Sequence, residues 1–246
     1  MIKTAAILSG GLGTRLGNLT TNTPKAMINI LCRPFIEYQL MLLHKAGIKK
    51  IIFCVGHLSN QIKSHIGDGK NFGLTVEYSD DGKELLGTGG AIKKALPLLG
   101  KVFFVLYGDS YLPCNYKEIA KYFLENEKKE LLALMTVFKN CNKWDKSNIV
   151  FKEGAVIAYD KTKALPEMNY IDFGLSILTE DAFKESAESC GEVFDLQSLF
   201  KDLISKSKLA GYEVFSRFYE IGSKKGIEEI EEFLLTYYSP QGKPLV

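Results

Sequence analysis

Runs of consecutive apolar residues alternate with segments of helical periodicity through the first half of the chain. Apolar runs without polar alternation are typical of strands buried on both faces, and we expect such strands at 3–8, 51–55, 74–78, 102–107 and 131–137. Between them, apolar positions three and four residues apart predict helices at 34–46, 59–66, 88–96 and 116–126. This alternation predicts an α/β fold of Rossmann-like type, with a mostly parallel sheet and helices on both faces.

The second half of the chain has a different pattern. Two short apolar segments, 148–150 and 156–158, flank Lys152-Glu153-Gly154 and predict a small β-hairpin insertion. Further strands are expected at 173–178 and 212–219, and further helices at 180–186, 196–205 and 225–237. We therefore expect one domain over 1–238, made of the halves 1–140 and 141–238, followed by a flexible tail at 239–246.

Composition and charge narrow the classes of function. The chain has 31 Lys and Arg residues against 29 Asp and Glu residues, so no overall field favours nucleic acid or a membrane surface. No apolar stretch approaches the roughly 18 residues that cross a bilayer. The five cysteines form no CxxC pair, and no signal peptide is evident. We expect a cytoplasmic protein without a zinc or disulfide redox site.

A glycine-rich loop, Leu8-Ser9-Gly10-Gly11-Leu12-Gly13-Thr14-Arg15, follows the first predicted strand. Glycines let successive backbone N–H groups approach phosphate oxygens, and an arginine adds a cation with bidentate geometry. The loop is not a dinucleotide fingerprint, because Leu16 stands where GxGxxG needs its third glycine, and the P-loop string GxxxxGK[ST] is absent. The loop therefore predicts a phosphate site of another kind.

Two further side chains are expected to join this loop. Lys25 follows Pro24 ten residues after Arg15, and Asp109 follows the fourth predicted strand. In open α/β sheets, ligands bind beyond the carboxyl ends of the strands, so the glycine loop and Asp109 should meet at one edge.

Three motifs together resemble the signature of the sugar-1-phosphate nucleotidyltransferases. They are Gly10-Gly11-Leu12-Gly13-Thr14-Arg15 with Pro24-Lys25, Leu86-Gly87-Thr88-Gly89-Gly90-Ala91, and Tyr107-Gly108-Asp109. Looser matches follow at Asp160-Lys161, Phe173-Gly174-Leu175 and Tyr219-Glu220-Ile221-Gly222-Ser223. The resemblance runs from residue 4 to about residue 235, and the short length is similar to one-domain bacterial members such as the heptose-1-phosphate guanylyltransferases.

The resemblance implies a GT-A-like fold and an Mg²⁺-dependent enzyme. A sugar 1-phosphate would attack the α-phosphorus of a nucleoside triphosphate and release pyrophosphate. The half 1–140 would bind the nucleotide and the half 141–238 the sugar phosphate. Arg15, Lys25 and Asp109 would be catalytic, and Asp109 and Glu220 would hold the metal. The implied nucleotide-binding residues are Leu8, Ser9, Gly10, Gly11, Gly13, Thr14, Glu84, Gly87, Thr88 and Gly108. The implied sugar-phosphate-binding residues are Lys161, Asp172 and Gly174.

Two of these positions depart from the family pattern. Glu220 stands where the family has an aspartate, and is either a metal ligand on a longer side chain or an ordinary exposed glutamate. Asp172 replaces an asparagine at the sugar site. A carboxylate accepts hydrogen bonds but cannot donate them, so Asp172 indicates either a different acceptor or a residue that only begins a strand.

The base and the acceptor are open. Guanine presents N–H donors, for which Glu84 is one candidate partner and Asp80 or Asp81 are competitors. GTP is therefore favoured over UTP or CTP. Alternatives are a non-sugar acceptor such as phosphocholine, and a nucleotide-sugar sensor without catalysis. Tyr237 and Tyr238 leave open a homodimer contact or packing against the core.

Overall fold

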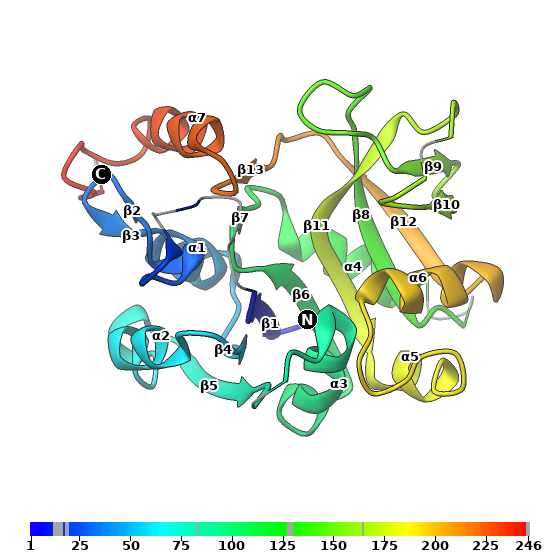
Figure 1. Ribbon diagram of the computed structural model, residues 1–246. Coiled ribbons are helices and arrows are strands. Elements are labelled where there is room, and N and C mark those ends of the chain that lie inside the picture. Colours follow the sequence, from blue (N-terminus) through cyan, green and yellow to red (C-terminus); the bar gives the residue numbers. More distant parts are fainter. Residues whose placement is uncertain (12–16, 18–19, 83, 127–129, 164, 245–246) are drawn as a thin grey trace.

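The computed structural model describes residues 1–11, 17, 20–82, 84–126, 130–163 and 165–244. The predicted ligands Gly13, Thr14 and Arg15 lie outside the described residues. A nine-stranded sheet runs through the molecule in the order β5-β4-β1-β6-β11-β8-β12-β10-β9 (Figure 1).

The first four strands of that order are parallel, as their continuous apolar sequences predict. β1 (Thr4–Ser9) lies between β4 (Lys50–Val55) and β6 (Val102–Tyr107), and β5 (Thr75–Asp80) pairs with β4 at the edge. Their carboxyl ends therefore open on one side of the sheet. The glycine loop after β1 and Asp109 after β6 are brought together there.

The second half of the sheet is mixed. β11 (Tyr170–Thr179) runs antiparallel to both β6 and β8 (Ala133–Lys139), while β12 (Leu209–Val214) is parallel to β8. The predicted hairpin is confirmed as β9 (Ile149–Lys152) and β10 (Ala155–Tyr159). β10 pairs with β12, and β9 also pairs with β11 through Ile149 and Tyr170, so these five strands close on one another.

Helices cover both faces of the sheet, as the sequence predicts. Ala5 and Ile7 of β1 face a core that contains residues of α1 (Phe35–Ala46), α2 (Ser59–Ile66) and α4 (Tyr116–Glu125). Ala6 faces the opposite core, which contains residues of α3 (Gly87–Leu99), α5 (Glu180–Glu185) and α6 (Leu196–Ser205). This alternation within one strand explains why Ala5, Ala6 and Ile7 are all buried.

Several short elements escaped prediction, because two-residue strands carry no periodicity. They are β2 (Asn29–Ile30), β3 (Arg33–Pro34), β7 (Ser110–Tyr111), β13 (Tyr219–Glu220) and the 3₁₀ turns η2 (Lys25–Met27) and η3 (Lys70–Phe72). The strand expected at 212–219 is in fact two strands: β12 ends at Val214, and β13 pairs with β7 outside the main sheet. The pairing of β13 with β7 places Glu220 opposite Ser110, next to Asp109.

Residues 239–244, for which the sequence predicts a flexible tail, form hydrogen bonds within the segment and to the rest of the chain. The Gly242 carbonyl accepts a hydrogen bond from Arg33 Nε at 3.1 Å, and Ser239 N donates to Lys243 O at 2.7 Å. Tyr238 packs edge-to-face on Tyr38, 5.0 Å between ring centroids, and Tyr237 is more than half exposed. The tail thus follows α7 (Lys224–Leu234), which lies beside the β2–β3 hairpin (Figure 1). None of the helices in the described ranges combines the length and the apolar character needed to cross a bilayer.

Candidate active site

A cavity of about 360 Å³ opens at the carboxyl ends of β1 and β6. Segments far apart in the chain form its wall: the end of β1, the start of η2, the turn after β6 and the first turn of α3. The predicted site residues that line it are Leu8, Ser9, Gly10, Gly11, Lys25, Gly87, Thr88, Gly108 and Asp109. The prediction that the glycine loop and Asp109 share one edge of the sheet is therefore confirmed for the described part of the loop.

Lys25 and Asp109 form an ion pair at the cavity wall. Lys25 Nζ donates to Asp109 Oδ2 at 3.0 Å, and the two side chains are 14% and 26% exposed. The second oxygen, Oδ1, accepts a hydrogen bond from Ser110 Oγ at 3.3 Å. The pair holds a cation and a carboxylate side by side in a partly buried place. This arrangement suits a site that binds both phosphate and a metal ion.

The glycine at 108 is required by a close approach of two strands. A Cβ on Gly108 would lie 2.2 Å from Ser9 Oγ and 3.0 Å from the Leu8 carbonyl oxygen. The Gly108 N–H donates to that same carbonyl at 2.9 Å. The ends of β1 and β6 are thereby held against each other, which fixes the glycine loop relative to Asp109.

The glycines of the Gly87–Gly90 turn have a role that the sequence does not show. A Cβ on Gly89 would lie 2.2 Å from the Phe194 ring, and one on Gly90 would lie 2.4 Å from the Glu192 carbonyl oxygen. Gly87 takes a positive φ of 71° and also meets the backbone of Phe194. These glycines therefore let the segment before α6 pack directly on the start of α3.

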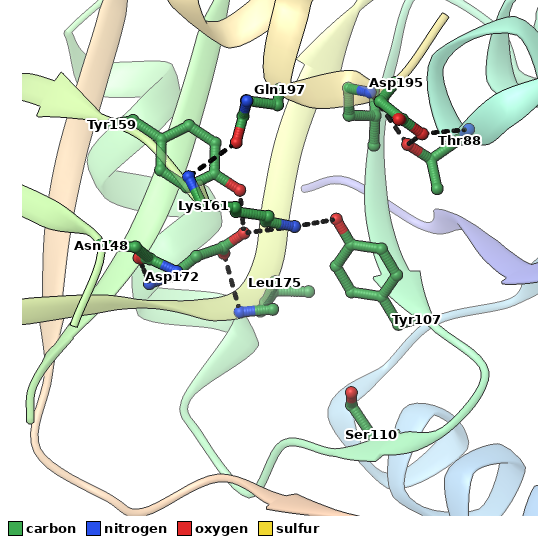
Figure 2. Close-up of polar contacts among 12 residues, drawn as sticks. Thr88, Tyr107, Ser110, Asn148, Tyr159, Lys161, Asp172, Leu175, Asp195 and Gln197 are labelled. Carbon is green, nitrogen blue, oxygen red and sulfur yellow. Dashed lines mark hydrogen bonds and ion pairs between the residues drawn. The ribbon is translucent and has the colours of Figure 1, made fainter. Parts of the chain in front are cut away.

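Asp195, in that segment, is a cavity residue that sequence reasoning missed. Its Oδ1 accepts hydrogen bonds from both the N–H and the hydroxyl of Thr88, each at 3.3 Å (Figure 2). In sequence, an aspartate directly before a predicted helix is most simply read as that helix's cap. Only the tertiary structure shows that its carboxylate is directed to another helix.

Lys161 lies in a polar cluster next to the cavity. Its Nζ donates to the Tyr107 hydroxyl at 3.3 Å and lies 3.9 Å from Asp172 Oδ2 (Figure 2). Tyr107 lines the cavity, so it connects the predicted phosphate ligand Lys161 to that space. Burial alone would lower the pKa of Lys161, but the interactions with Tyr107 and Asp172 outweigh burial and leave the pKa raised. The ammonium group is thus stabilised in its charged form.

Asp172 is nearly buried, with 6% of its side chain exposed. Its Oδ2 accepts from the Tyr159 hydroxyl at 3.0 Å, and its Oδ1 accepts from the Gly174 N–H at 3.0 Å. The bulge of β11 between Asp172 and Ser176, with a φ of 99° at Gly174, turns that N–H back toward the carboxylate. Both oxygens therefore have partners within the protein, including the nearby Lys161.

Glu220 is placed beside Asp109 by strand pairing. β13 pairs with β7 so that Glu220 is opposite Ser110, and the Ile221 N–H donates to the Asp109 carbonyl at 3.0 Å. The two residues predicted as metal ligands thus occupy adjacent backbone positions, although they are 111 residues apart in the sequence. Across the described ranges, no three His, Cys, Asp or Glu side chains gather into a preformed metal cluster.

Of the three acidic candidates for base recognition, the structure puts Asp81 in the cavity wall. Glu84 is exposed and is not among the described lining residues, and Asp80 pairs with Lys63 at 2.9 Å. Asp81 Oδ1 is buried and has no hydrogen-bond partner among the described residues. Burial raises the pKa of Asp81, as expected for a carboxylate with little solvent around it.

A family model described as "Nucleotidyl transferase" matches residues 4–236. The chain belongs to the nucleotidyl transferase family. The D-glycero-alpha-D-manno-heptose 1-phosphate guanylyltransferase of Campylobacter jejuni subsp. jejuni is 33% identical over 220 residues, 89% of this chain and 94% of that protein. The enzyme of the same name from Aneurinibacillus thermoaerophilus is 28% identical over 94% of this chain and 99% of that protein.

The nucleotidyltransferase fold is shared by solved structures. HddC from Yersinia pseudotuberculosis, complexed with GMP-PN, matches with a TM-score of 0.75 at 24% identity, over 95% of this chain and 100% of that one. At that identity the likeness establishes the fold. The predicted family, the α/β fold and the nucleotidyltransferase class are thereby confirmed.

Proposed function

We propose that this nucleotidyltransferase makes a GDP-sugar and pyrophosphate from GTP and a sugar 1-phosphate with the heptose configuration that its relatives' names specify. Both full-length relatives described above carry that name. The observation that carries the proposal is the combination, in one cavity, of the Lys25–Asp109 pair with the carboxylate of Asp81. The first suits a triphosphate with its metal, and the second suits the N–H donors of guanine.

In this reaction an oxygen of the sugar phosphate forms a bond to the α-phosphorus, while the bond from that phosphorus to the pyrophosphate oxygen breaks. The attacking group is already an anion, so the enzyme needs to position charges and neutralise them rather than supply a base. Lys25 would offset charge on the triphosphate. Arg15, which lies outside the described residues, would do so on the leaving pyrophosphate.

Magnesium fits the donor set near Asp109. Mg²⁺ is commonly bound by one or two carboxylates together with substrate phosphate oxygens, and does not need a protein cage. Asp109 and Glu220, on neighbouring backbone segments, would hold it. The ion would neutralise charge as the phosphorus–oxygen bonds change. The Asp109 carboxylate would then be shared between the metal and Lys25.

Lys161 would contact the phosphate of the acceptor. Its raised pKa keeps the ammonium group charged, and Tyr107 holds it at the edge of the cavity. Asp172 would act as a positioning residue for Lys161 rather than as a ligand of the sugar, because Tyr159 and Gly174 already occupy its oxygens. This role is neither of the two interpretations that the sequence offered for Asp172, and Gly174 would contribute through the N–H that fixes that carboxylate.

The test is a panel of the four ribonucleoside triphosphates with several sugar 1-phosphates, and with phosphocholine, in the presence of Mg²⁺. Pyrophosphate release with GTP and a heptose 1-phosphate above all other pairs would support the proposal. A preference for UTP or CTP would contradict the assignment of guanine as the base. A preference for phosphocholine would contradict the assignment of a sugar 1-phosphate as the acceptor. Absence of release with every pair would favour a sensor without catalysis.

A further inference from the structure

The carboxylate of Asp195 is fixed between the first turns of two helices. Its Oδ1 accepts two hydrogen bonds from Thr88 of α3 (Figure 2). The Thr88 hydroxyl in turn accepts from the Leu196 N–H of α6 at 2.9 Å. Phe194 strengthens the junction, because its carbonyl accepts from the N–H groups of Gly89 and Gly90 at 2.8 and 3.1 Å. The position of Asp195 is therefore set by both halves of the chain.

Asp195 does not cap its own helix. It occupies the N-cap position of α6, yet it makes no side-chain hydrogen bond there. The Thr88 hydroxyl of α3 accepts from the first N–H of α6. The side chain of an N-cap aspartate usually accepts a hydrogen bond from an N–H of its own helix. The Asp195 carboxylate is directed instead toward Thr88 and the cavity, and capping does not explain this orientation.

The surroundings of Asp195 restrict what it can bind. One oxygen is held by Thr88, and the residue is exposed on the cavity side. The negative charge of Asp195 interacts with Lys161 and Tyr159 and contributes to the raised pKa of both groups. A carboxylate repels phosphate oxygens and can only accept hydrogen bonds, so its neutral partners are N–H and O–H donors, and on a sugar these are the hydroxyl groups.

On the proposed function above, we infer that Asp195 is a recognition residue for sugar hydroxyls: Oδ1 is anchored on Thr88, and Oδ2 accepts hydrogen bonds from ring hydroxyls of a sugar bound between Thr88 and Lys161. The hydroxyls belong either to the acceptor sugar or to the ribose of the nucleotide. Both present vicinal hydroxyls that a carboxylate oxygen can accept.

Asp195→Asn is the informative variant. An asparagine keeps an oxygen for Thr88 and replaces only the free acceptor by an NH₂ group, so the junction between α3 and α6 should persist. Glu192→Gln is the matched control in the same segment, because the Glu192 side chain is 87% exposed and forms an ion pair with Lys93. Thermal denaturation should give the same melting temperature for both variants and the wild type.

Binding is measured by calorimetry with GDP, 2′-deoxy-GDP and GDP-mannose, the last as a nucleotide sugar of manno configuration. Loss of a hydrogen bond to a charged group should weaken binding about tenfold or more in Asp195→Asn. If the variant binds GDP and GDP-mannose more weakly by the same factor but binds 2′-deoxy-GDP as the wild type does, Asp195 recognises the ribose hydroxyls. If only the binding of GDP-mannose is weakened, Asp195 recognises hydroxyls of the acceptor sugar.

Two results would overturn the inference. One is unchanged binding of all three probes by Asp195→Asn. The other is a shift in the Mg²⁺ concentration needed for turnover with unchanged sugar recognition, which would make Asp195 a metal ligand. Failure of the proposed function looks different, because the wild type itself would then neither bind these guanine nucleotides nor turn over GTP.

Discussion

The Phe194 ring lies so close to Gly89 that a Cβ on that glycine would be 2.2 Å from it. Two parts of the chain about a hundred residues apart thus meet with no room for a single methyl group. Gly89→Ala should therefore push the segment 192–195 away from α3. Overpacking of this kind costs about 1–3 kcal/mol, reduced by up to about 1 kcal/mol for the better helix propensity of alanine.

Urea denaturation of Gly89→Ala measures this loss of stability. Gly191→Ala, directly before the segment 192–195, is the control, since no heavy atom lies within 4 Å of a Cβ built there. Equal stability of the two variants would contradict the close packing. Because Asp195 follows Phe194 in the chain, Gly89→Ala should also weaken nucleotide-sugar binding.

The Lys25–Asp109 pair should matter for turnover much more than for folding. Lys25→Met removes a cation from the cavity wall, and loss of one preorganised electrostatic group typically lowers kcat about 10²–10³-fold. Asp109→Asn should abolish Mg²⁺-dependent pyrophosphate release. Lys63→Met removes the comparable surface pair with Asp80 and should leave turnover unchanged. Turnover by Asp109→Asn at the wild-type rate would exclude it from the metal site.

Asp172 should set the pH range over which Lys161 stays charged. Asp172→Asn removes a negative charge 3.9 Å from Lys161 Nζ, so the raised pKa of Lys161 should fall toward or below its ordinary value. The charged form is the one that binds phosphate. The alkaline limb of kcat/KM for the sugar phosphate should therefore move to lower pH.

Tyr159→Phe is the matched variant for that experiment. It removes the hydroxyl that donates to Asp172 but leaves the carboxylate charge in place. Its alkaline limb should stay near that of the wild type. If both variants shift equally, the hydrogen bond rather than the charge controls Lys161, and the role assigned to Asp172 is wrong.

Asp81 should decide between GTP and ITP, which lacks the 2-amino group of guanine. Asp81→Asn keeps one acceptor oxygen and loses the charge, so the preference for GTP over ITP should fall about tenfold, as for one hydrogen bond to a charged group. Glu84→Gln should leave the preference unchanged, because Glu84 is exposed and does not appear in the described cavity wall. The ratio of kcat/KM for the two triphosphates is the measurement, and a change in Glu84→Gln alone would reverse the assignment.

The parts of the site that could be predicted from sequence are those that directly follow buried strands. Gly10 and Gly11 come after β1, and Asp109 comes after β6, so the rule for parallel sheets was enough to bring them together. Asp81 also follows a strand, β5, but nothing in its sequence context favours it over Glu84. Asp81 is favoured because its side chain is partly buried, and burial depends on neighbours that only the folded chain supplies.

The alternation of strands and helices, the hairpin and the signature motifs can all be predicted from the order of the residues, because apolar periodicity and local turn chemistry act over a few neighbouring residues. Three relationships depend on the complete fold: Asp195 turns to Thr88, Tyr159 and Gly174 enclose Asp172, and β13 brings Glu220 beside Asp109. These relationships join side chains and two-residue strands across long stretches of chain. No local propensity encodes them, and they arise only when the whole sheet and both helical layers have packed.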